Sequence, residues 1–240
     1  MIDVSCTGIS IPAIDVTLAA RLGLRPDVRR IPITESGCAA GALAAALART
    51  GQRMLVVAVE LCSLSLVRED RTRTNLIASV LFGDGVAAAI VEPGGAGPRI
   101  SAVGSHLIED SSHIMGFDVG DHGLRIFLDR APPSVLVESL PPVMEQFLER
   151  HGRRRADIGL HLIHPGGRRV LEAYAAINEL EADALRFSRD SLRRYGNLSS
   201  ASVLTVLEIA LAECVRPNTT AFMLAVGPSL SLEMLLLEFD

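Results

Sequence analysis

The chain has 240 residues, which is enough for one large α/β domain or two small ones. Its net charge of −5 argues against a nucleic-acid-binding protein, because neutralising phosphates requires a basic face, and no apolar run approaches the length of a membrane span. Hydrophobic residues make up 49% of the chain but aromatic residues only 4%. A core built mainly from Ala, Val, Leu and Ile is typical of buried parallel strands covered by helices, so the composition favours an α/β fold.

The four cysteines, Cys6, Cys38, Cys62 and Cys214, lie far apart and form no CxxC pair. This spacing favours reduced thiols in a cytoplasm over a disulfide framework, and it predicts no zinc or other metal site. The start of the chain has no signal-peptide pattern, because Asp3 follows Met-Ile and no basic stretch precedes an apolar one. We therefore expect a cytoplasmic protein.

The first part of the chain alternates strand-like and helix-like segments. Residues 53–60 form a continuous apolar run of strand length, as expected for a strand buried on both faces. An alanine-rich helix precedes this run, beginning at or next to Cys38 and ending near Gly51, so strand, helix and strand form a βαβ unit. Residues 61–80 are polar, and we expect them to be irregular. The other expected elements are strands at residues 2–7, 28–34 and 86–91, a helix at residues 13–22 and a glycine turn at residues 81–85.

The clearest break in the chain is Glu92-Pro93-Gly94-Gly95-Ala96-Gly97-Pro98, and it divides the sequence into two halves, residues 1–94 and 95–240. The second half repeats the alternation of strands and helices. Its expected strands lie at residues 99–105, 159–163, 220–226 and 234–239, with a hairpin arm at residues 123–128; its expected helices lie at residues 132–150, 170–180, 190–195 and 197–213. Both halves therefore predict similar α/β units.

Three polar residues stand at the ends of expected elements, where a site could be assembled. Cys38 lies at a helix start, where free amides and the helix dipole favour the nucleophilic thiolate. His164 follows a buried strand and Asn197 precedes a buried helix, so an imidazole and an amide could donate to a developing oxyanion. Each residue also has a simpler interpretation, as a packed cysteine, a turn cap and a helix cap. We expect His164 and Asn197 to converge on a common point near the Cys38 sulfur.

Four motifs, in this order, resemble the type III polyketide synthases, the chalcone synthase-like members of the thiolase fold. They are Glu35-Ser36-Gly37-Cys38-Ala39-Ala40-Gly41, Leu81-Phe82-Gly83-Asp84-Gly85, Ile163-His164-Pro165-Gly166-Gly167 and Tyr195-Gly196-Asn197-Leu198-Ser199-Ser200-Ala201. The resemblance covers essentially all of the chain and includes a closing Val226-Gly227-Pro228-Ser229, where the family usually has a second glycine in place of Ser229. The related ketoacyl-ACP synthases typically have His-Gln-Ala-Asn in place of the His-Pro-Gly-Gly motif, which favours the polyketide branch. The implied fold is two similar α/β halves with layered helices and sheets.

The resemblance implies a role for each matched side chain. Cys38 would hold the acyl and polyketide thioester, while His164 and Asn197 would promote malonyl decarboxylation and stabilise oxyanions. Phe82 matches the phenylalanine that guards the junction of the coenzyme A tunnel and the cavity. The other residues expected to contact substrate are Phe117, Ile126, Gly166, Gly167 and Ser199. The implied substrates are acyl-CoA and malonyl-CoA, no cofactor is bound permanently, and the implied assembly is a homodimer.

Two positions depart from the plant-type pattern. A second phenylalanine that lines the plant-type site is Ile126 here, and a small residue on the cavity wall is Phe117. A chalcone product is therefore not expected. The sequence Met115-Gly116-Phe117 looks more like the bacterial alkylresorcinol and alkylpyrone synthases, which favour fatty acyl starters.

In the family, an N-terminal segment precedes the matching region and supplies the first strand, helices and the basic residues that hold the coenzyme A phosphates. Met1 matches a position in the second strand, so we expect these parts to be absent, a strand to be missing from the middle of the first sheet and apolar surface to be uncovered. The alternative function is a non-catalytic remnant that pairs with another chain as a binding or assembly partner. A ketoacyl-ACP synthase III-like condensing enzyme and a papain-like thiol hydrolase are further alternatives.

Overall fold

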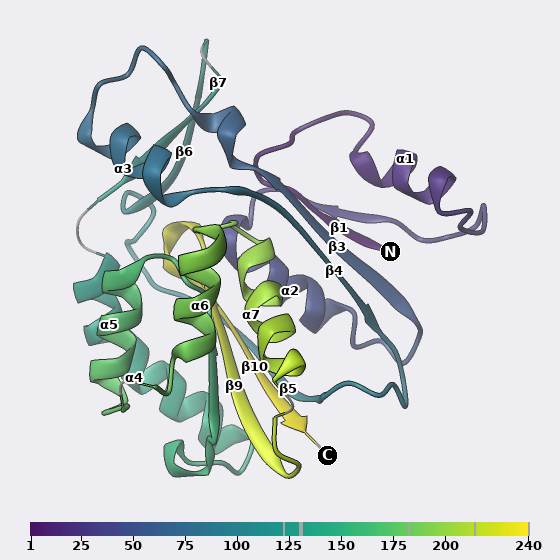
Figure 1. Ribbon diagram of the computed structural model, residues 1–240, viewed down its shortest axis with the longest axis vertical. Coiled ribbons are helices and arrows are strands. Elements are labelled where there is room, and N and C mark those ends of the chain that lie inside the picture. The colour runs from purple at the N-terminus through teal and green to yellow at the C-terminus, as the bar shows by residue number, and fades with distance from the viewer. Residues whose placement is uncertain (122, 130–131, 182, 214, 240) are drawn as a thin grey trace.

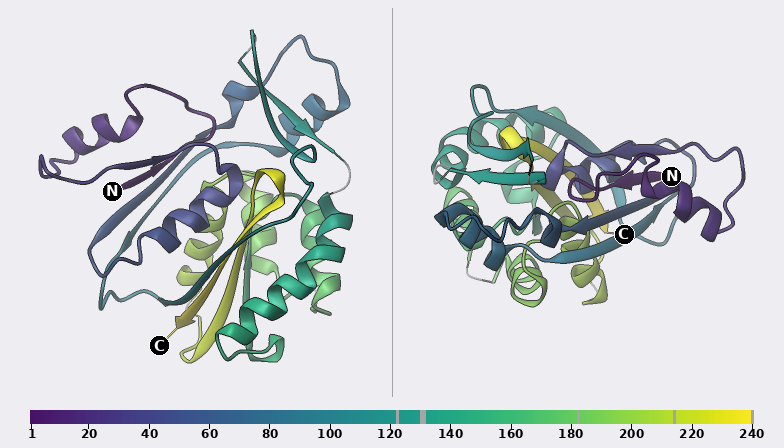
Figure 2. Two further views of the ribbon diagram at one scale, coloured as in Figure 1. Left: turned by 180° about the vertical axis from the view of Figure 1, so that it is seen from behind. Right: turned by 90° about the horizontal axis from the view of Figure 1, so that it is seen from above.

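The computed structural model describes residues 1–121, 123–129, 132–181, 183–213 and 215–239. Two four-stranded sheets face each other across a layer of helices (Figures 1 and 2). The first sheet has the order β2 (Ile31–Ile33), β1 (Ile2–Val4), β3 (Met54–Leu61) and β4 (Asp84–Val91). The second sheet has the order β5 (Arg99–Leu107), β10 (Ser231–Phe239), β9 (Thr219–Val226) and β8 (Leu160–Ile163). Cys214 lies outside the described residues.

The two sheets share a pairing scheme. In the first sheet, β1 pairs in parallel with β2 and β3, while β4 runs antiparallel to β3. In the second sheet, β8 pairs in parallel with β9, while β10 runs antiparallel to both β9 and β5. The sequence β1, β3, β4 therefore corresponds to β8, β9, β10, and the prediction of two similar α/β halves is confirmed.

The layer between the sheets consists of α2 (Ala40–Leu47) and α7 (Ala201–Ala212). Both helices are apolar around most of their circumference, as expected for helices buried on all sides. Small side chains let them approach closely: a Cβ on Gly41 would lie 2.0 Å from the carbonyl oxygen of Ser200, just before α7. This contact ties the Cys38 region to the Asn197 region, because each precedes one of the two helices.

Helices also cover the outer faces. The second sheet is covered by α4 (Pro132–Arg150) and α5 (Arg168–Ile177), whose apolar side chains, including Leu140 and Met144, pack against those of β9 and β10. Next to them, α6 (Arg186–Tyr195) packs against α7 and β8. On the first sheet, α1 (Ile14–Arg21) lies beside β1. None of the helices in the described ranges is both long and apolar enough to cross a membrane.

Residues 61–80 are more ordered than the sequence analysis expected. They contain a short 3-10 turn at Cys62–Ser65 and the start of α3 (Arg73–Leu81). The helix begins where the Thr72 side chain accepts a hydrogen bond from the amide of Asn75. The expectation of an irregular segment was wrong because the apolar residues of α3, Leu76, Ile77 and Val80, are exposed instead of forming a buried stripe.

Other expected elements differ from the structure mainly in their bounds. The first two strands are shorter than expected, at three residues each. The arm at residues 123–128 is confirmed as β7 (Gly123–Leu128), and it pairs with β6 (Met115–Gly120), a strand that the sequence analysis did not predict. Strand β6 bears on the candidate site, because its pairing with β7 places Phe117 opposite Ile126.

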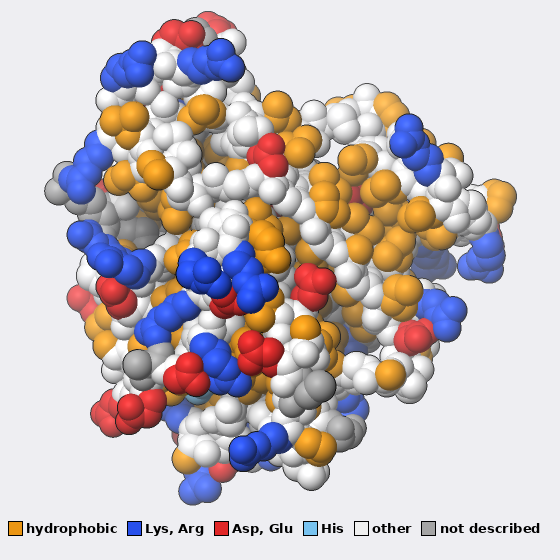
Figure 3. Space-filling model, viewed as in Figure 1, with side chains coloured by type: hydrophobic (Ala, Val, Ile, Leu, Met, Phe, Trp, Pro, Cys, Tyr) orange, Lys and Arg blue, Asp and Glu red, His pale blue; other side chains and the backbone are white. Residues whose placement is uncertain are grey.

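The expected gap in the middle of the first sheet is absent. Ile2 and Val4 pair directly with Val56 and Ala58 of the neighbouring strand β3, so the interior ladder is continuous. The difference between the sheets lies at an edge: β5 borders β10, whereas no strand within the described ranges borders β4 on its outer side. Val86 and Ile90 of β4 are 63% and 64% exposed, and Figure 3 shows hydrophobic side chains gathered on this face. Uncovered apolar surface is therefore present as expected, but it lies on β4 at the edge of the first sheet and not at a gap in its middle.

Candidate active site

Cys38 lies in a 3-10 turn, Gly37–Ala39, that leads directly into α2. The preceding Gly37 has φ +51°, and a Cβ at this position would lie 2.6 Å from the ring of Pro228 in the other half of the molecule. Only glycine allows this approach. The turn therefore places Cys38, which is half-buried, at the junction of the two halves.

Backbone hydrogen bonds across the junction fix Phe82 and Asn197 side by side. The amide of Asn197 donates to the carbonyl oxygen of Leu81 over 2.8 Å, and the amide of Gly83 donates to the carbonyl oxygen of Asn197 over 3.0 Å. These bonds form an isolated parallel bridge between Phe82 and Asn197. Gly196 has φ +73°, and a Cβ there would lie 2.8 Å from the Leu81 oxygen, so the Tyr-Gly-Asn motif needs its glycine for this bridge.

The side chain of Asn197 is held in one orientation. Its Oδ1 accepts hydrogen bonds from the amide of Ser199 over 2.9 Å and from Ser202 Oγ over 3.3 Å. The acceptor end of the amide is therefore occupied, and the Nδ2 group is the end left to donate. Because Asn197 is almost fully buried, this donor works in a site with little competing water.

His164 follows β8 and is almost fully buried, with its amide bonded to the carbonyl oxygen of Leu224 over 2.8 Å. Within the described part of the chain, its buried Nδ1 atom has no hydrogen-bond partner. Burial lowers the pKa of His164 to about 4, so the imidazole is neutral at pH 7. A neutral imidazole keeps one N–H donor and one free acceptor nitrogen, which suits both donation to an oxyanion and acceptance of a proton.

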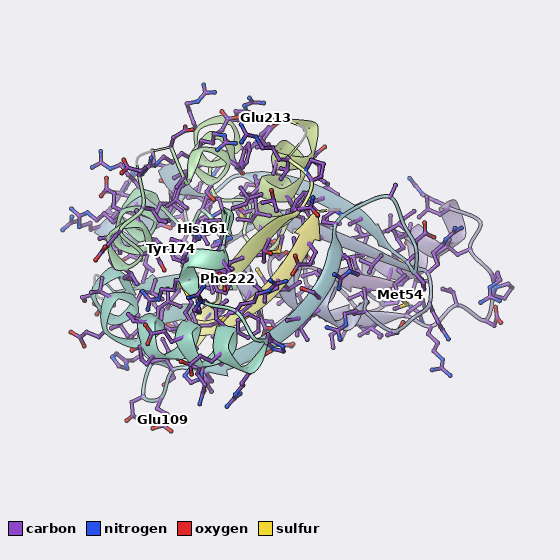
Figure 4. All side chains as sticks on the ribbon, turned by 90° about the horizontal axis from the view of Figure 1, so that it is seen from below. Met54, Glu109, His161, Tyr174, Glu213 and Phe222 are labelled. Atoms are coloured by element: carbon purple, nitrogen blue, oxygen red, sulfur yellow. The ribbon has the colours of Figure 1, made fainter. Side chains whose placement is uncertain are left out.

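A second buried histidine, on β8 itself, has a different environment. His161 Nδ1 lies 2.8 Å from the hydroxyl of Tyr174 on α5, and Figure 4 shows these two side chains next to each other. Burial lowers the pKa of His161 to about 4 as well. The hydrogen bond to Tyr174 explains His161 as a structural residue, whereas no described residue offers such a partner to His164.

Two adjoining cavities are lined by the residues that the sequence analysis assigned to the site. The larger has a volume of about 660 Å³, and the smaller, of about 30 Å³, is an inner chamber. Cys38, Phe82 and Met115 line both, so Phe82 stands where the two meet. The larger cavity is also lined by His164, Asn197, Gly166 and Gly167, and the inner chamber by Phe117, Ile126 and Ser199. The structure therefore brings the cysteine, histidine and asparagine to one cavity.

The acidity of Cys38 differs from the expectation. Burial raises the pKa of the Cys38 thiol to about 11, and the negative charge of Glu60 adds to the rise, while contact with Ser199 Oγ at 3.5 Å partly offsets it. The expectation of a thiolate is therefore wrong. A backbone hydrogen bond at Cys38 does lower its pKa, but burial and the charge of Glu60 outweigh it, and the neutral His164 supplies no positive charge. Cys38 is therefore a thiol at rest, and its attack requires a base.

Sequence reasoning missed a buried polar network behind Cys38. Glu60, at the end of β3, is fully buried and accepts hydrogen bonds from the amide of Cys6 over 3.2 Å, from Thr7 Oγ1 over 2.6 Å and from Ser200 Oγ. Cys6 Sγ donates to Glu60 Oε2 over 3.4 Å and lies 3.1 Å from Ser199 Oγ. The only signal in the sequence was one carboxylate in an otherwise apolar strand.

The network joins the two halves through side chains. Glu60 belongs to the first half, and Ser199 and Ser200 belong to the second, so the carboxylate fixes the loop that also carries Asn197. Burying this charge is tolerated because several donors compensate for the lost water. The network therefore positions the Asn197 loop against Cys38.

Comparison with known proteins agrees with this arrangement. Residues 1–98 match the family model for the N-terminal domain of chalcone and stilbene synthases, and residues 100–239 match the model for the C-terminal domain. A 1,3,6,8-tetrahydroxynaphthalene synthase of Streptomyces peucetius subsp. caesius is 40% identical over 98% of this chain and 66% of its own length. An alpha-pyrone synthesis polyketide synthase-like protein, Pks18 of Mycobacterium tuberculosis, is 32% identical over 97% of this chain and 63% of its own length.

Solved structures support the same assignment. The crystal structure of 1,3,6,8-tetrahydroxynaphthalene synthase from Streptomyces coelicolor A3(2), described as a bacterial type III polyketide synthase, superposes with a TM-score of 0.95 at 34% identity, and covers 100% of this chain and 71% of that one. The C-terminal type III polyketide synthase domain of Steely1 from Dictyostelium superposes with a TM-score of 0.90 at 28% identity. The chain spans about two thirds of the length of the curated relatives that it matches. It belongs to the chalcone and stilbene synthase family, the type III polyketide synthases with a thiolase-like fold.

Proposed function

We propose that this chain catalyses the decarboxylative condensation of malonyl-CoA with an acyl-CoA starter through a thioester on Cys38. The observation that carries the proposal is the single cavity of about 660 Å³ lined by Cys38, His164 and Asn197. A nucleophile and two donors that lie around one cavity are the groups that such a reaction needs.

In the loading step, the Cys38 sulfur attacks the thioester carbonyl of acyl-CoA. The new carbon–sulfur bond replaces the bond to coenzyme A, whose sulfur leaves. Because the pKa of Cys38 is raised to about 11, its proton must be removed as attack proceeds, and neutral His164 is the base in the same cavity. His164 then protonates the departing coenzyme A thiolate, so the proton is returned.

In the extension step, malonyl-CoA loses CO₂, and the electrons of the broken carbon–carbon bond form an enolate on the thioester. The N–H of His164 and the Nδ2 group of Asn197 donate to the enolate oxygen; removing one donor of this kind typically costs about 10²–10³ in rate. The enolate carbon then attacks the Cys38 thioester, and the Cys38 sulfur leaves. Phe82, between the two cavities, would limit water access to the intermediates.

We propose fatty acyl groups as starters, on the resemblance of Met115-Gly116-Phe117 to alkylresorcinol and alkylpyrone synthases. The larger cavity is the space available to such a chain, since the inner chamber, at about 30 Å³, has room for only about two water molecules. Phe117 and Ile126 line that small chamber. A long starter would therefore extend away from these residues.

The remaining parts of the proposal concern the cellular setting. A cytoplasm supplies coenzyme A thioesters and keeps Cys38 reduced. A homodimer is proposed as the assembly because exposed apolar surface favours burial against a partner. A second candidate function, a non-catalytic assembly partner, is favoured by one observation, the unpaired outer edge of β4 with its exposed Val86 and Ile90.

The test is incubation with radiolabelled malonyl-CoA and a panel of acyl-CoAs of increasing chain length, followed by extraction of products. We expect labelled products with the wild-type chain and with His161→Gln, and none with Cys38→Ala or His164→Gln. His161 is the matched control because it is a buried histidine on β8, the strand that ends just before His164, and its side chain contacts Tyr174. A folded wild-type chain that gives no labelled product with any starter would favour the assembly partner.

A further inference from the structure

The larger cavity has two chemically different ends. Its deep end is lined by His164 and Asn197, which are each only 2% exposed. Three exposed arginines also line it: Arg73, the first residue of α3, and Arg168 and Arg169, the first residues of α5. Figure 3 shows basic side chains above and below the hollow between these two helices. The cavity therefore runs from a buried neutral site to a cationic rim.

The rim arginines are available to bind an anion. Arg168 contacts Glu172 over 3.4 Å, but both side chains are exposed, and ion pairs of this kind contribute little. For Arg73 and Arg169, no ion pair is recorded within the described ranges. Asp129 is the one acidic residue among those described that line the cavity. Among the described residues that line the cavity, three arginines therefore outnumber a single carboxylate.

The start of α5 adds to the positive potential. Its N-cap residue is Gly167, which offers no side chain to accept hydrogen bonds from the first-turn amides. Those amides and the helix dipole favour a negative group near Arg168 and Arg169. Arginine also suits phosphate because its guanidinium group can donate two parallel hydrogen bonds.

We propose that Arg73, Arg168 and Arg169 bind the phosphates of the coenzyme A thioester while its acyl end lies at Cys38. This inference rests on the proposed function and assigns the phosphate site to residues of this chain. Apolar residues, including Ile77, Leu136 and Val170, line the space between the two ends and suit the uncharged pantetheine arm.

The test compares ligands with and without phosphates. Coenzyme A and pantetheine are titrated into the wild-type chain and into R73E, R168E, R169E and the double variant R168E/R169E, with binding followed by calorimetry. The control is R150E, an exposed arginine at the far end of α4, about 21 Å along the helix from cavity residue Leu136 at about 1.5 Å per residue. In parallel, KM is measured for malonyl-CoA and for malonyl-N-acetylcysteamine, which has no phosphate.

We expect the double variant to raise both the Kd of coenzyme A and the KM for malonyl-CoA by about tenfold or more. This is the change expected when one or two hydrogen bonds to a charged group are lost. Pantetheine binding and KM for the N-acetylcysteamine thioester should not change, and R150E should match the wild type. Increasing salt should weaken coenzyme A binding only in the wild type and R150E. Equal effects on both ligands, or no effect on either, would overturn the assignment.

The outcomes also separate this inference from the proposed function. Arginine-dependent binding of coenzyme A without any product formation would support the phosphate site and refute the proposed reaction. Turnover of the N-acetylcysteamine thioester without measurable coenzyme A binding would support the reaction and overturn the phosphate site.

Discussion

The raised pKa of Cys38 can be tested directly by measuring its rate of alkylation. At pH 7, a thiol with a pKa of about 11 is ionised to roughly one part in 10⁴, whereas an ordinary thiol of pKa about 8.5 is ionised to roughly 3%. Iodoacetamide reacts with the thiolate, so Cys38 should react about 300-fold more slowly than an unperturbed cysteine at this pH.

The pH profile gives a second readout of the same property. The alkylation rate of Cys38 should rise about tenfold per pH unit from pH 7 to 9.5 without a plateau, because this range lies below its pKa of about 11. Cys62, with a pKa raised to about 12 by burial, should react more slowly than Cys38, and Cys6, whose pKa burial raises further, more slowly still. Mass spectrometry of the cysteine peptides measures all three rates in one sample.

A substitution at Ser199 tests the cause of the shift. Contact with Ser199 Oγ lowers the pKa of Cys38, so Ser199→Ala should raise it further and slow alkylation at every pH. Ser65→Ala is the control, because Ser65 lines the same inner chamber but bonds to the carbonyl oxygen of Cys62. A plateau in the Cys38 rate below pH 8.5 would refute the reasoning, because it would show a thiolate already formed near neutral pH.

Two further predictions concern stability. Gly41→Ala should lower the free energy of unfolding by about 1–3 kcal/mol or more, because the new methyl group would lie 2.0 Å from a backbone carbonyl oxygen before α7. Gly97→Ala is the control and should leave the free energy of unfolding unchanged, because no described atom lies within 4 Å of its new methyl group. Urea denaturation compares the two variants. Burial lowers the pKa values of His161 and His164 to about 4, so as the pH falls from 6.5 toward 4 the unfolded chain binds protons that the folded chain does not, and stability is lost. Asp3 opposes this loss, because burial raises its pKa to about 6 and the folded chain then binds the proton first. The urea midpoint should therefore depend less on pH in His161→Gln and His164→Gln; an unchanged slope would contradict the burial of the neutral imidazoles.

Much of the fold follows from local patterns in the sequence. The apolar run at residues 53–60 and the alanine-rich segment after Cys38 each carry enough information to predict a buried strand and a buried helix. By contrast, α3 could not be predicted from periodicity, because Leu76, Ile77 and Val80 are exposed. The missed strand β6 contains two glycines and an aspartate, residue types that are rare in strands, and only its pairing with β7 makes it regular.

The residues of the candidate site could be found from motifs, but their electrostatics could not. Cys38, His164 and Asn197 stand in motifs whose glycines allow close contacts between the two halves, so sequence order predicts their convergence. The acidity of Cys38 depends on burial and on the distant Glu60, and neither is visible along the chain. The unpaired edge at β4 is likewise a property of strand order, which local patterns do not determine.

The most direct test of the central claim separates Cys38 from the two donors. Release of labelled CO₂ from [14C]malonyl-CoA is measured for the wild type, Cys38→Ala, His164→Gln, Asn197→Ala and the control His161→Gln, each checked for folding. If His164 and Asn197 stabilise the enolate, Cys38→Ala should still release CO₂ but form no condensed product, while His164→Gln and Asn197→Ala should lose about 10²–10³ in the rate of CO₂ release. Loss of CO₂ release in Cys38→Ala together with full release in His164→Gln and Asn197→Ala would contradict the assignment of these roles.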